Sequence, residues 1–433
     1  MSAIFTLTGN PFVDAGIYVM SELLGKEIDE IEREDLKELI PRLVDVYFTD
    51  KWKSMIPSIF TKNHPAVHSR IKSNREYYKG LLYALVDDVR ELSSFGACVS
   101  CGRRDKSSIE RKSGIGRELV PLTGSAELVN FFPRAMLGLE MCSACLLAIQ
   151  FMPIFLHYCG GKFLLMHSAS DKVMRYWAKN CVNHLRKQIV TGNFTGCFVS
   201  DEKNPVNSLF KSIENLIREY DERWFDEDVA IRFYHFANPG QSPSVEIFDV
   251  PSPVFRFLAY VKQIDSYDAW VKILRRGETT RGVNRVYMGL LNGESIVRYF
   301  FGDEREIYGN WNLLKFYLKE VREMDEKRIN AIRAFADRIS DLILQLDDDK
   351  RLRQIENAKD YAEFRNVLRF IEKDAIRVGF GEPIVKFDEY VNLILPDGAI
   401  GWNEVRDLLL FRIYEVLHGW LVKRKFEVGE QSE

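Results

Sequence analysis

The sequence predicts an α+β protein, in which a mixed N-terminal region with a clip of four cysteines precedes a C-terminal helical bundle. Three observations predict this class. Two CxxC pairs lie about forty residues apart, two strand-like runs flank a turn near the middle of the chain, and helical periodicity continues from about residue 309 almost to the end. We therefore expect an N-terminal domain over residues 1–308, with a cysteine-bearing insertion at about 96–148, and a helical domain over 309–433.

The composition is that of an ordinary globular protein. The chain has 433 residues, of which 46% are hydrophobic and 28% are charged, enough for two or three domains with a buried core. No apolar run approaches the ~20 residues that a membrane span needs, and the N-terminus lacks the pattern of a signal peptide. We therefore expect a cytoplasmic protein without a membrane partner. The net charge of −3 argues against a uniformly basic nucleic-acid binder and leaves localised basic surfaces.

The N-terminal region is expected to begin with a turn and two helices. Gly9, Asn10 and Pro11 in the stretch TGNPFVDAG mark a turn, and Asp14 is a candidate cap for the helix that follows. An acidic amphipathic helix is expected within residues 29–48, because its apolar side chains recur near helical spacing. These side chains are Ile31, Leu36, Leu39, Ile40 and Leu43.

The middle of the chain changes its pattern several times. Residues 80–92 predict a helix, and residues 102–141, between the cysteine pairs, are loop-like. Helical patterns dominate residues 146–220, with a break at Gly160 and Gly161. Residues 229–260 predict two strands around an NPGQSP turn.

The C-terminal region is expected to be helical throughout. One buried stripe steps by three or four residues through Ile329, Ile332, Phe335, Ile339, Leu342 and Leu346. Two more helices are predicted at residues 365–379, ending at Gly379, and at residues 402–425.

The cysteines indicate the most specific chemistry in the chain. Four of the seven form the pairs Cys98/Cys101 and Cys142/Cys145. Because a CxxC turn presents two sulfurs to one ion and zinc prefers four tetrahedral thiolates, we predict one structural Zn²⁺ held by all four. Gly102 directly after the second cysteine allows the tight turn that such a site uses. The alternatives are two disulfides or redox pairs, or buried unpaired thiols. A site closed by four thiolates has no open position for catalysis.

Three stretches rich in Lys and Arg are candidates for nucleic-acid contact. Residues 51–79 combine seven basic residues and interleaved aromatic rings with one acid, which suits phosphate contacts and base stacking. The loop between the cysteine pairs and residues 272–287 are also basic. The alternative for each stretch is a solvated face. The candidates are Lys51, Lys53, Lys62, Arg70, Lys72, Arg75, Lys79, Arg103, Arg104, Lys106, Arg111, Lys112, Arg117, Arg275, Arg276, Arg281 and Arg285.

Signatures of enzymes are mostly absent from the sequence. It contains no P-loop, no HExxH and no GxSxG motif, so we expect a non-catalytic protein. His64 and His68 are four residues apart, as in a metal pair on a helix, but Pro65 and the missing acidic partner favour a turn or a phosphate contact. An enzyme that uses a carboxylate cluster not visible in the sequence is an alternative.

Three ordered motifs resemble the CRISPR-associated CXXC–CXXC proteins. They are TGNPFVDAG near the start, CVSCG…PLTGSAELVNFFP…MCSAC, and YHFANPGQSPSVEIFDVPSPVFRFL in the middle. The resemblance covers most of residues 1–300 and implies the large subunit of a type I-B effector (Cascade) complex. Such a subunit is non-catalytic, binds target DNA, reads the short adjacent motif (PAM), stabilises the DNA strands and helps to recruit a helicase–nuclease in antiviral defence. The resemblance implies crRNA, target DNA and other Cascade subunits as partners, and zinc at the same four cysteines.

The resemblance also implies a C-terminal bundle similar to the small subunit of Cascade. Met324 precedes 109 residues that look like a self-contained helical unit, and we hypothesise a second translation start near it. Two alternatives remain open for the whole chain. A zinc-ribbon protein that binds or processes RNA outside CRISPR would bind RNA as an isolated chain. A purely structural scaffold would show no salt-dependent affinity for DNA.

Overall fold

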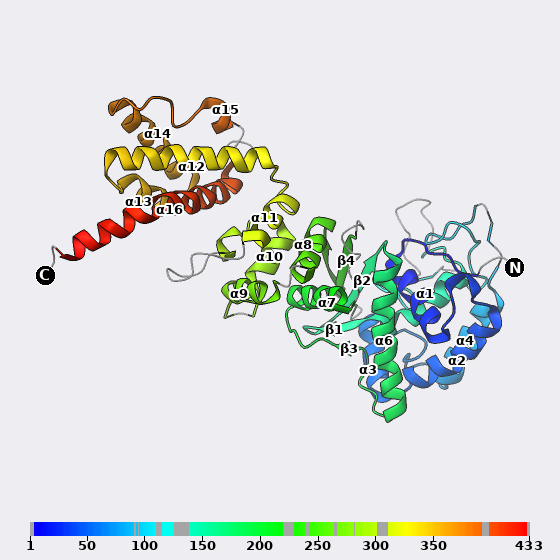
Figure 1. Cartoon of the computed structure of the whole chain (residues 1–433). Coiled ribbons are helices and arrows are strands. Elements are labelled where there is room, and N and C mark those ends of the chain that lie inside the picture. The colour runs from blue at the N-terminus through cyan, green and yellow to red at the C-terminus, as the bar shows by residue number, and fades with distance from the viewer. Residues whose placement is uncertain are drawn as a thin grey trace. The chain divides into compact units, whose positions relative to one another are not determined.

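The computed structural model confirms the predicted α+β class. It describes residues 4–90, 92–93, 95–109, 115–124, 138–219, 229–238, 243–263, 266–280, 282–300, 311–391 and 398–430. The chain divides into two compact units, of which the N-terminal unit comprises Met1–Ala259 with Thr279–Tyr287 and the C-terminal unit comprises Tyr260–Glu278 with Met288–Glu433 (Figure 1). The C-terminal unit thus begins before residue 309, where the sequence predicts the boundary. No helix among the described residues has the length and apolar character needed to cross a membrane.

The N-terminal unit holds all the strands of the described chain. Its helices are α1 (Pro11–Leu24), η1 (Ile28–Glu30), α2 (Arg33–Tyr47), α3 (Asp50–Ile59), α4 (Asn74–Asp87), α5 (Ser143–Phe151), η2 (Met152–Phe155), α6 (Asp171–Thr191) and α7 (Pro205–Glu219). Its strands are β1 (His157–Cys159), β2 (Lys162–Ser168), β3 (Phe198–Val199), β4 (Ile231–Ala237) and β5 (Ser244–Val250). Helix α8 (Ser252–Gln263) follows β5 and leads into the C-terminal unit.

The strands form one five-stranded sheet in the order β3-β1-β2-β4-β5. Neighbouring strands are antiparallel, except that β1 and β3 are parallel. The predicted hairpin around the NPGQSP turn is confirmed as β4 and β5, with Phe233 opposite Phe248. The helical prediction is wrong for β1 and β2, which form a second hairpin. Gly160 and Gly161 join them with φ of 58° and 85°, the left-handed conformation of a two-residue hairpin turn.

Helices α1 and α5 pack against each other in the core of the N-terminal unit. Every residue of α5 is buried, and the middle of α1 is buried as well. The two backbones approach closely at Gly16, where a built Cβ atom would lie 1.7 Å from the carbonyl oxygen of Ala148. Glycine is therefore required at this position.

The start of α1 is fixed by the motif TGNPFVDAG. Asn10, rather than Asp14, is the N-cap, and its side chain accepts hydrogen bonds from the N–H groups of Phe12 and Val13. Asp14 lies inside the first turn, where its carboxylate accepts from the N–H groups of Thr8 and Gly9 at 2.8 and 2.9 Å. The motif thus folds the chain before the helix back onto its first turn.

A buried polar network centres on Gln150, a residue of α5. The side-chain oxygen of Gln150 contacts Nε2 of His64 at 3.0 Å and accepts from the hydroxyl of Tyr78 at 3.2 Å. The hydroxyl of Tyr47 donates to the Gln150 carbonyl at 2.6 Å. His64 is fully buried, so the structure supports neither a metal pair with His68 nor a phosphate contact at His64.

The burial of His64 makes the stability of the fold dependent on pH. Burial lowers the pKa of His64 to about 4, whereas an unfolded histidine titrates near 6.5. The unfolded chain therefore binds the proton first as the pH falls below about 6.5, and the native state loses about 2 kcal/mol between pH 7 and pH 5. In urea titrations, His64→Gln should shrink the difference in unfolding free energy between these two pH values by about that amount.

The matched substitution His68→Gln replaces a half-buried imidazole four residues away and is measured in the same way. The effect of His64→Gln on the pH dependence should be the larger of the two. An unchanged pH dependence in His64→Gln would show that the imidazole of His64 is not the group that titrates.

The C-terminal unit is helical in its described residues. Its elements are α9 (Tyr267–Gly277), α10 (Arg285–Asn292, which the unit boundary crosses), η4 (Val297–Phe300), α11 (Trp311–Glu320), α12 (Glu326–Leu346), α13 (Lys350–Asn357), α14 (Tyr361–Arg377), α15 (Phe387–Glu389) and α16 (Gly398–Glu430). Helices α12 and α16 lie side by side (Figure 1). The predicted apolar stripe is buried along α12 at Ile332, Phe335, Ile339 and Leu342.

The surroundings of Met324 do not favour a self-contained product that starts there. Met324 is 1% exposed, and its N–H donates to the carbonyl of Leu318 at 2.9 Å. Glu404 of α16 is 3% exposed and accepts from Arg322 Nε at 3.1 Å and from Ser295 Oγ at 3.0 Å. A product starting at Met324 would lack both partners of this carboxylate.

Candidate metal centre and nucleic-acid interface

The two cysteine pairs meet at one point in the N-terminal unit. The sulfur atoms of Cys98, Cys101, Cys142 and Cys145 all lie within 4.8 Å of one another, and three of the four residues are buried. The sulfurs of Cys101 and Cys142, from different pairs, are 3.8 Å apart. None of the seven cysteines forms a disulfide. The four thiols are therefore placed to bind a single metal ion.

The spacing of the sulfur atoms fits zinc. Tetrahedral zinc binds thiolate at about 2.3 Å, which places neighbouring sulfurs about 3.8 Å apart. This is the distance between the sulfurs of Cys101 and Cys142. A complete set of four soft thiolate donors is also the set that structural zinc sites use.

Short backbone hydrogen bonds build the first pair into a tight loop. The N–H of Gly102 donates to the carbonyl of Cys98 at 2.9 Å, and Gly102 has a φ of 61°. The N–H of Cys98 donates to the carbonyl of Arg104 at 3.0 Å. The N–H of Val99 donates to the carbonyl of Glu140 at 2.8 Å, which joins the loop to the second pair. The loop that carries the first pair is thus defined by its backbone.

The second pair lies at the start of a buried helix. Cys142 is the N-cap residue of α5, and Cys145 lies in its first turn. The Asp88 carboxylate fixes this helix start by accepting from Ser143 Oγ at 2.5 Å, and it also accepts from the Ser108 N–H at 2.9 Å. Burial acts to raise the pKa of Asp88, but these hydrogen bonds lower it below its ordinary value. Asp88 therefore stays ionised and ties both arms of the site together.

Contacts between the thiols split their pKa values. Hydrogen bonds with the other three thiols lower the pKa of Cys98, and hydrogen bonds with Cys142 and Cys145 lower the pKa of Cys101. The hydrogen bond with Cys101 is the main cause that raises the pKa of Cys142 and of Cys145. Four thiols at this spacing do not all ionise by themselves. A bound divalent cation is the group that would keep all four as thiolates.

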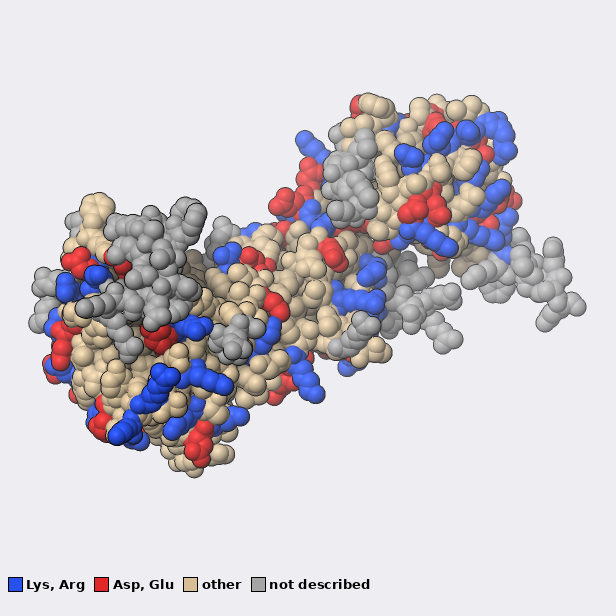
Figure 2. All heavy atoms as spheres, turned by 180° about the vertical axis from the view of Figure 1, so that it is seen from behind, with Lys and Arg blue, Asp and Glu red and all other residues tan. Residues whose placement is uncertain are grey.

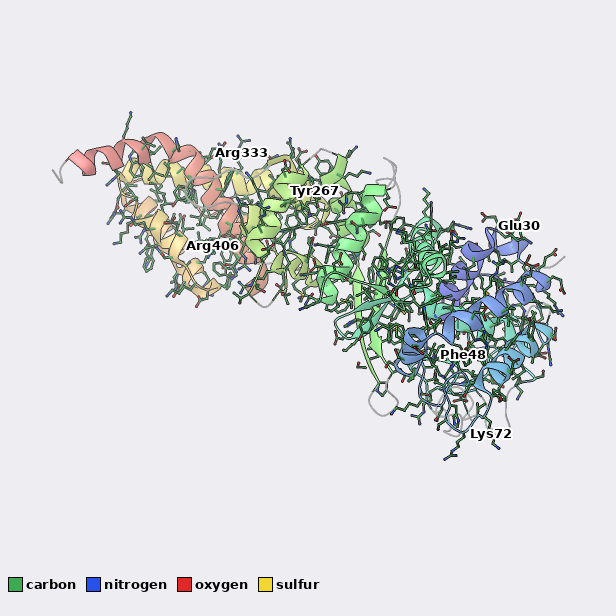
Figure 3. The ribbon with its side chains drawn as sticks, turned by 90° about the horizontal axis from the view of Figure 1, so that it is seen from below. Glu30, Phe48, Lys72, Tyr267, Arg333 and Arg406 are labelled. Carbon is green, nitrogen blue, oxygen red and sulfur yellow. The ribbon has the colours of Figure 1, made fainter. Side chains whose placement is uncertain are left out.

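The basic segment 51–79 lies on α3, on α4 and on the turns between them. Lys51, Lys53, Lys62, Arg70, Lys72 and Arg75 are exposed, and Lys79 is half-buried. Figure 3 shows Lys72 pointing away from the ribbon. In the view of Figure 2, a group of Lys and Arg side chains gathers on the lower part of the N-terminal unit. The predicted basic residues of this segment are therefore on the surface.

Phe48 brings two parts of this segment together. Lys53 Nζ lies 5.7 Å from the centre of the Phe48 ring, and the Arg75 guanidinium lies 5.8 Å from it. Arg75 also pairs with Asp45. Phe48 directly follows α2, so residues from three helices meet at this ring. We call the exposed residues Lys51, Lys53, Lys62, Arg70, Lys72 and Arg75 the basic surface.

One arginine between the cysteine pairs is structural, which corrects the prediction for Arg104. Arg104 is 3% exposed, and its guanidinium donates to the carbonyl of Arg90 at 2.7 Å and to the carbonyl of Ile4. Gly96 packs on the Arg104 backbone, where a Cβ atom would lie 2.3 Å from its N and O atoms. Its neighbour Arg103 is exposed. The guanidinium of Arg104 therefore holds the cysteine loop to the N-terminal segment and does not face solvent.

The two neighbouring arginines should behave differently when replaced. Arg104→Ala should lower the free energy of unfolding by about 3 kcal/mol, because the buried guanidinium and its hydrogen bonds to the carbonyls of Arg90 and Ile4 would be lost. Arg103→Ala should change stability by less than about 0.5 kcal/mol. Urea denaturation of both variants checks this prediction. Equal stability of the two variants would contradict the buried role of Arg104.

The remaining predicted basic residues differ in their surroundings. Lys106, Arg275 and Arg285 are exposed, and Arg117 is half-buried. Arg276 donates to the carbonyl of Tyr299 at 3.0 Å. Arg275 and Arg276 belong to the C-terminal unit, and Arg285 belongs to the N-terminal unit. Outside the described residues lie Arg111, Lys112 and Arg281.

Sequence reasoning missed the residues that support the metal centre. Asp88, Ser107 and Ser143 form a hydrogen-bonded group in which the hydroxyls of Ser107 and Ser143 lie 2.5 Å apart. Nothing in their spacing indicates this contact, because residues 88, 107 and 143 are far apart in the chain. The only signal of this group in the local sequence is Ser143, which stands inside the second CxxC pair.

The comparisons with known proteins concern one segment of the chain. A family model described as CRISPR-associated protein (Cas_CXXC_CXXC) matches residues 91–156. This segment contains both cysteine pairs, and over it the match confirms the resemblance to CRISPR-associated CXXC–CXXC proteins that the motifs predicted. The other two motifs of the resemblance lie outside it. The searches of curated proteins and of solved structures returned no match.

Proposed function

We propose that this chain, a CRISPR-associated protein of the CXXC–CXXC type, is the large subunit of a type I-B RNA-guided effector complex. In this role it binds target DNA beside the crRNA, reads the PAM, stabilises the opened strands and helps to recruit a helicase–nuclease. The observation that carries the proposal is the four-thiol site, which lies within the matched segment 91–156. The ion at this site is Zn²⁺, and its role is structural. The protein acts in the cytoplasm.

The basic surface supports the DNA-binding part of the proposal. In an RNA-guided complex, base pairing with the guide reads the sequence, and the protein contacts mainly the backbone and the short flanking motif. Exposed lysines and arginines near an aromatic ring suit this task, because they neutralise phosphates without selecting bases. The net charge of −3 is compatible with it, since other faces of the subunit pack on protein.

The absence of catalytic motifs in the sequence also supports this proposal. Cleavage belongs to the recruited helicase–nuclease, so the large subunit needs no active site of its own. The metal centre has four protein ligands and no open position for a substrate. We therefore propose that this chain is not an enzyme.

The test is DNA binding by the complex reconstituted with and without this chain, on targets that differ only in the flanking PAM. We expect the chain to be required and PAM discrimination to depend on it. A variant with Lys53, Lys62 and Lys72 changed to Ala should weaken binding. It should also reduce the slope of log K against log salt by about 0.9 for each phosphate that the protein no longer neutralises.

The matched control removes three lysines that already pair with carboxylates. Lys26, Lys37 and Lys162 form ion pairs with Asp35, Glu34 and Glu246. Their triple alanine variant changes the net charge equally and should leave the salt slope unchanged. If the complex binds and discriminates its targets equally well without the chain, the proposed function is wrong.

A further inference from the structure

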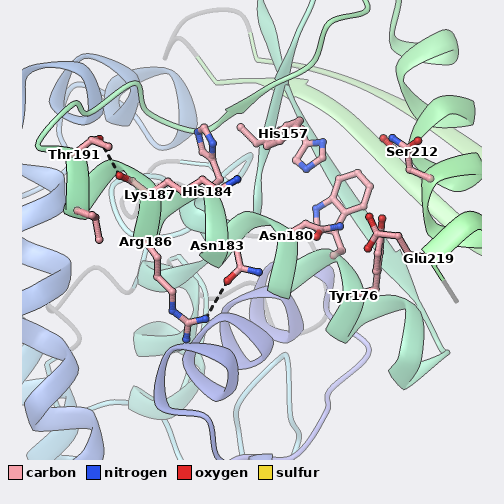
Figure 4. Close-up of a pocket in the computed structure, with 14 residues that line it drawn as sticks. His157, Tyr176, Asn180, Asn183, His184, Arg186, Lys187, Thr191, Ser212 and Glu219 are labelled. Carbon is pink, nitrogen blue, oxygen red and sulfur yellow. Dashed lines mark hydrogen bonds between the residues drawn. The ribbon is translucent and has the colours of Figure 1, made fainter.

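A cavity of about 680 Å³ lies in the N-terminal unit, apart from the metal centre (Figure 4). It is lined by residues of α6, α7, β1 and β3. Its volume falls within the range of about 300 to 1,000 Å³ that is typical of sites for small ligands. None of its lining residues takes part in the function described so far.

Stacked rings form one wall of the cavity. The ring of His157 lies between those of Trp177 and Phe198, with centroid distances of 4.0 and 4.5 Å. The ring of His184 meets Phe198 edge-on at 5.3 Å. Phe198 is 37% exposed, so it presents part of its ring to solvent. The wall offers a flat aromatic surface of the kind on which nucleobases stack.

One polar atom in this wall has no partner within the described chain. His157 is 7% exposed, and its Nε2 atom is buried without a hydrogen bond to any described residue. Burial, followed by the charge of His184, lowers the pKa of His157 to about 3, so the ring is neutral at physiological pH. An unsatisfied buried nitrogen is costly in free energy.

Polar side chains of the helices also line the cavity. Asn180 of α6 and Asn215 of α7 are among them, and amide side chains offer both donors and acceptors. Asn183 of α6 also lines the cavity, but its side-chain oxygen accepts a hydrogen bond from Arg186 at 3.2 Å (Figure 4). Lys187 of α6 is exposed and also lines it. Arg186 is engaged elsewhere, since it donates to the Glu22 carbonyl at 2.8 Å. The cavity thus combines a stacking surface, amides, one ammonium group and the carboxylate of Glu219.

The rim of the cavity is fixed and borders the basic surface. The Gln188 side chain donates to the Gly196 carbonyl at 2.8 Å and accepts from the Thr195 N–H at 3.0 Å, which holds the loop before Phe198. Gly196 packs on α3, because a Cβ atom built there would lie 3.3 Å from Cγ of Lys51. The basic surface therefore reaches the loop that carries Phe198.

We propose that this cavity holds one unstacked nucleobase of a single-stranded nucleic acid whose backbone follows the basic surface. The base stacks on the ring of Phe198, and the asparagine amides of α6 and α7 bind its edge. Lys187 contacts a neighbouring phosphate. This inference rests on the proposed function, and it adds a specific site for a strand that has left the duplex.

Two probes test the proposal on the full-length chain. The first is a single-stranded oligothymidylate that carries one 5-iodouracil, and the second is the mononucleotide 5-iodo-dUMP. After irradiation, mass spectrometry of the cross-linked peptides should place both probes on the segment with Phe198 or His184. Phe198→Ala should weaken oligonucleotide binding about tenfold, the effect of removing one base–aromatic stack. It should leave the salt slope unchanged, because the substitution removes no charge.

Three controls make the outcomes distinguishable. Phe387→Ala removes a phenylalanine that is 80% exposed in the C-terminal unit and should not change binding. Lys51→Ala with Lys53→Ala should lower the salt slope by about 1.4, or about 0.7 for each phosphate of a single strand. Thermal melting of each variant confirms that it is folded.

The results distinguish a failure of the cavity proposal from a failure of the proposed function. If the oligonucleotide binds with the expected salt slope but neither cross-links to the cavity nor weakens in Phe198→Ala, the cavity proposal is overturned and the function stands. If only the mononucleotide cross-links there, the cavity binds nucleotides and the strand-binding role fails. If neither probe binds the full-length chain, the cavity proposal is overturned, and the proposed function is decided separately by the measurement on the reconstituted complex.

Discussion

Gly16→Ala should prevent the N-terminal unit from folding stably. A methyl group at this position would overlap the carbonyl of Ala148, from which it would be separated by only 1.7 Å. Both groups belong to the packed backbones of α1 and α5, so neither can move without separating the two helices. We expect a loss of more than about 4 kcal/mol in the free energy of unfolding. Circular dichroism and urea denaturation measure it.

Gly80 offers the matched control, since it lies in helix α4 with no atom within 4 Å of a built Cβ. Gly80→Ala should stabilise the protein by about 0.5 to 1 kcal/mol, because alanine loses less backbone entropy on helix formation than glycine. A Gly16→Ala variant as stable as the unsubstituted protein would mean that α1 and α5 do not pack at this distance.

Removing the metal should cause the second large effect. We expect one zinc per chain by elemental analysis, and Cys145→Ser should abolish it. The loss should destabilise the N-terminal unit by about 5 kcal/mol, because the ion joins the cysteine loop to the start of α5. For a unit of this size, that corresponds to a fall in melting temperature of roughly 10 to 20 °C.

Cys159→Ser is the control for the metal experiment. Cys159 is also buried, and its sulfur donates to the Glu202 carbonyl at 3.1 Å, a contact that a serine hydroxyl can replace. This variant should keep one zinc per chain. A protein that carries no metal, and whose unfolded chain exposes only three reactive thiols before reduction, would instead support the two disulfides.

Much of the fold could be predicted from the sequence, because long amphipathic helices leave a periodic signal. The helix predicted within residues 29–48 is α2, and four of the six side chains of the predicted apolar stripe are buried in α12. Strands β1 and β2 were missed for a physical reason. They are three and seven residues long, and their apolar runs contain too few residues to separate a strand from a buried helix. The sequence signal that separates a hairpin from a helix at this place is the glycine pair Gly160–Gly161.

In the candidate site, too, some features could be predicted from the sequence and others could not. The four cysteines are brought together as their spacing predicts, because a CxxC turn is a local structure. Which of Arg103 and Arg104 faces inward depends on the path of the whole cysteine loop, including its contact at Gly96. The wall of the cavity joins His157, Trp177 and Phe198 through the sheet and α6, and no local pattern in the sequence connects them.

The chain passes between its two units three times, at residues 259/260, 278/279 and 287/288. No single cut in the gene therefore yields both units intact. A deletion from residue 288 onward would leave α9 behind, with the buried side chains of Trp270 and Ile273 deprived of the rest of their unit. A phenotype of such a truncation cannot be assigned to one unit. Replacing one unit by that of a relative requires the exchange of two separate stretches of coding sequence.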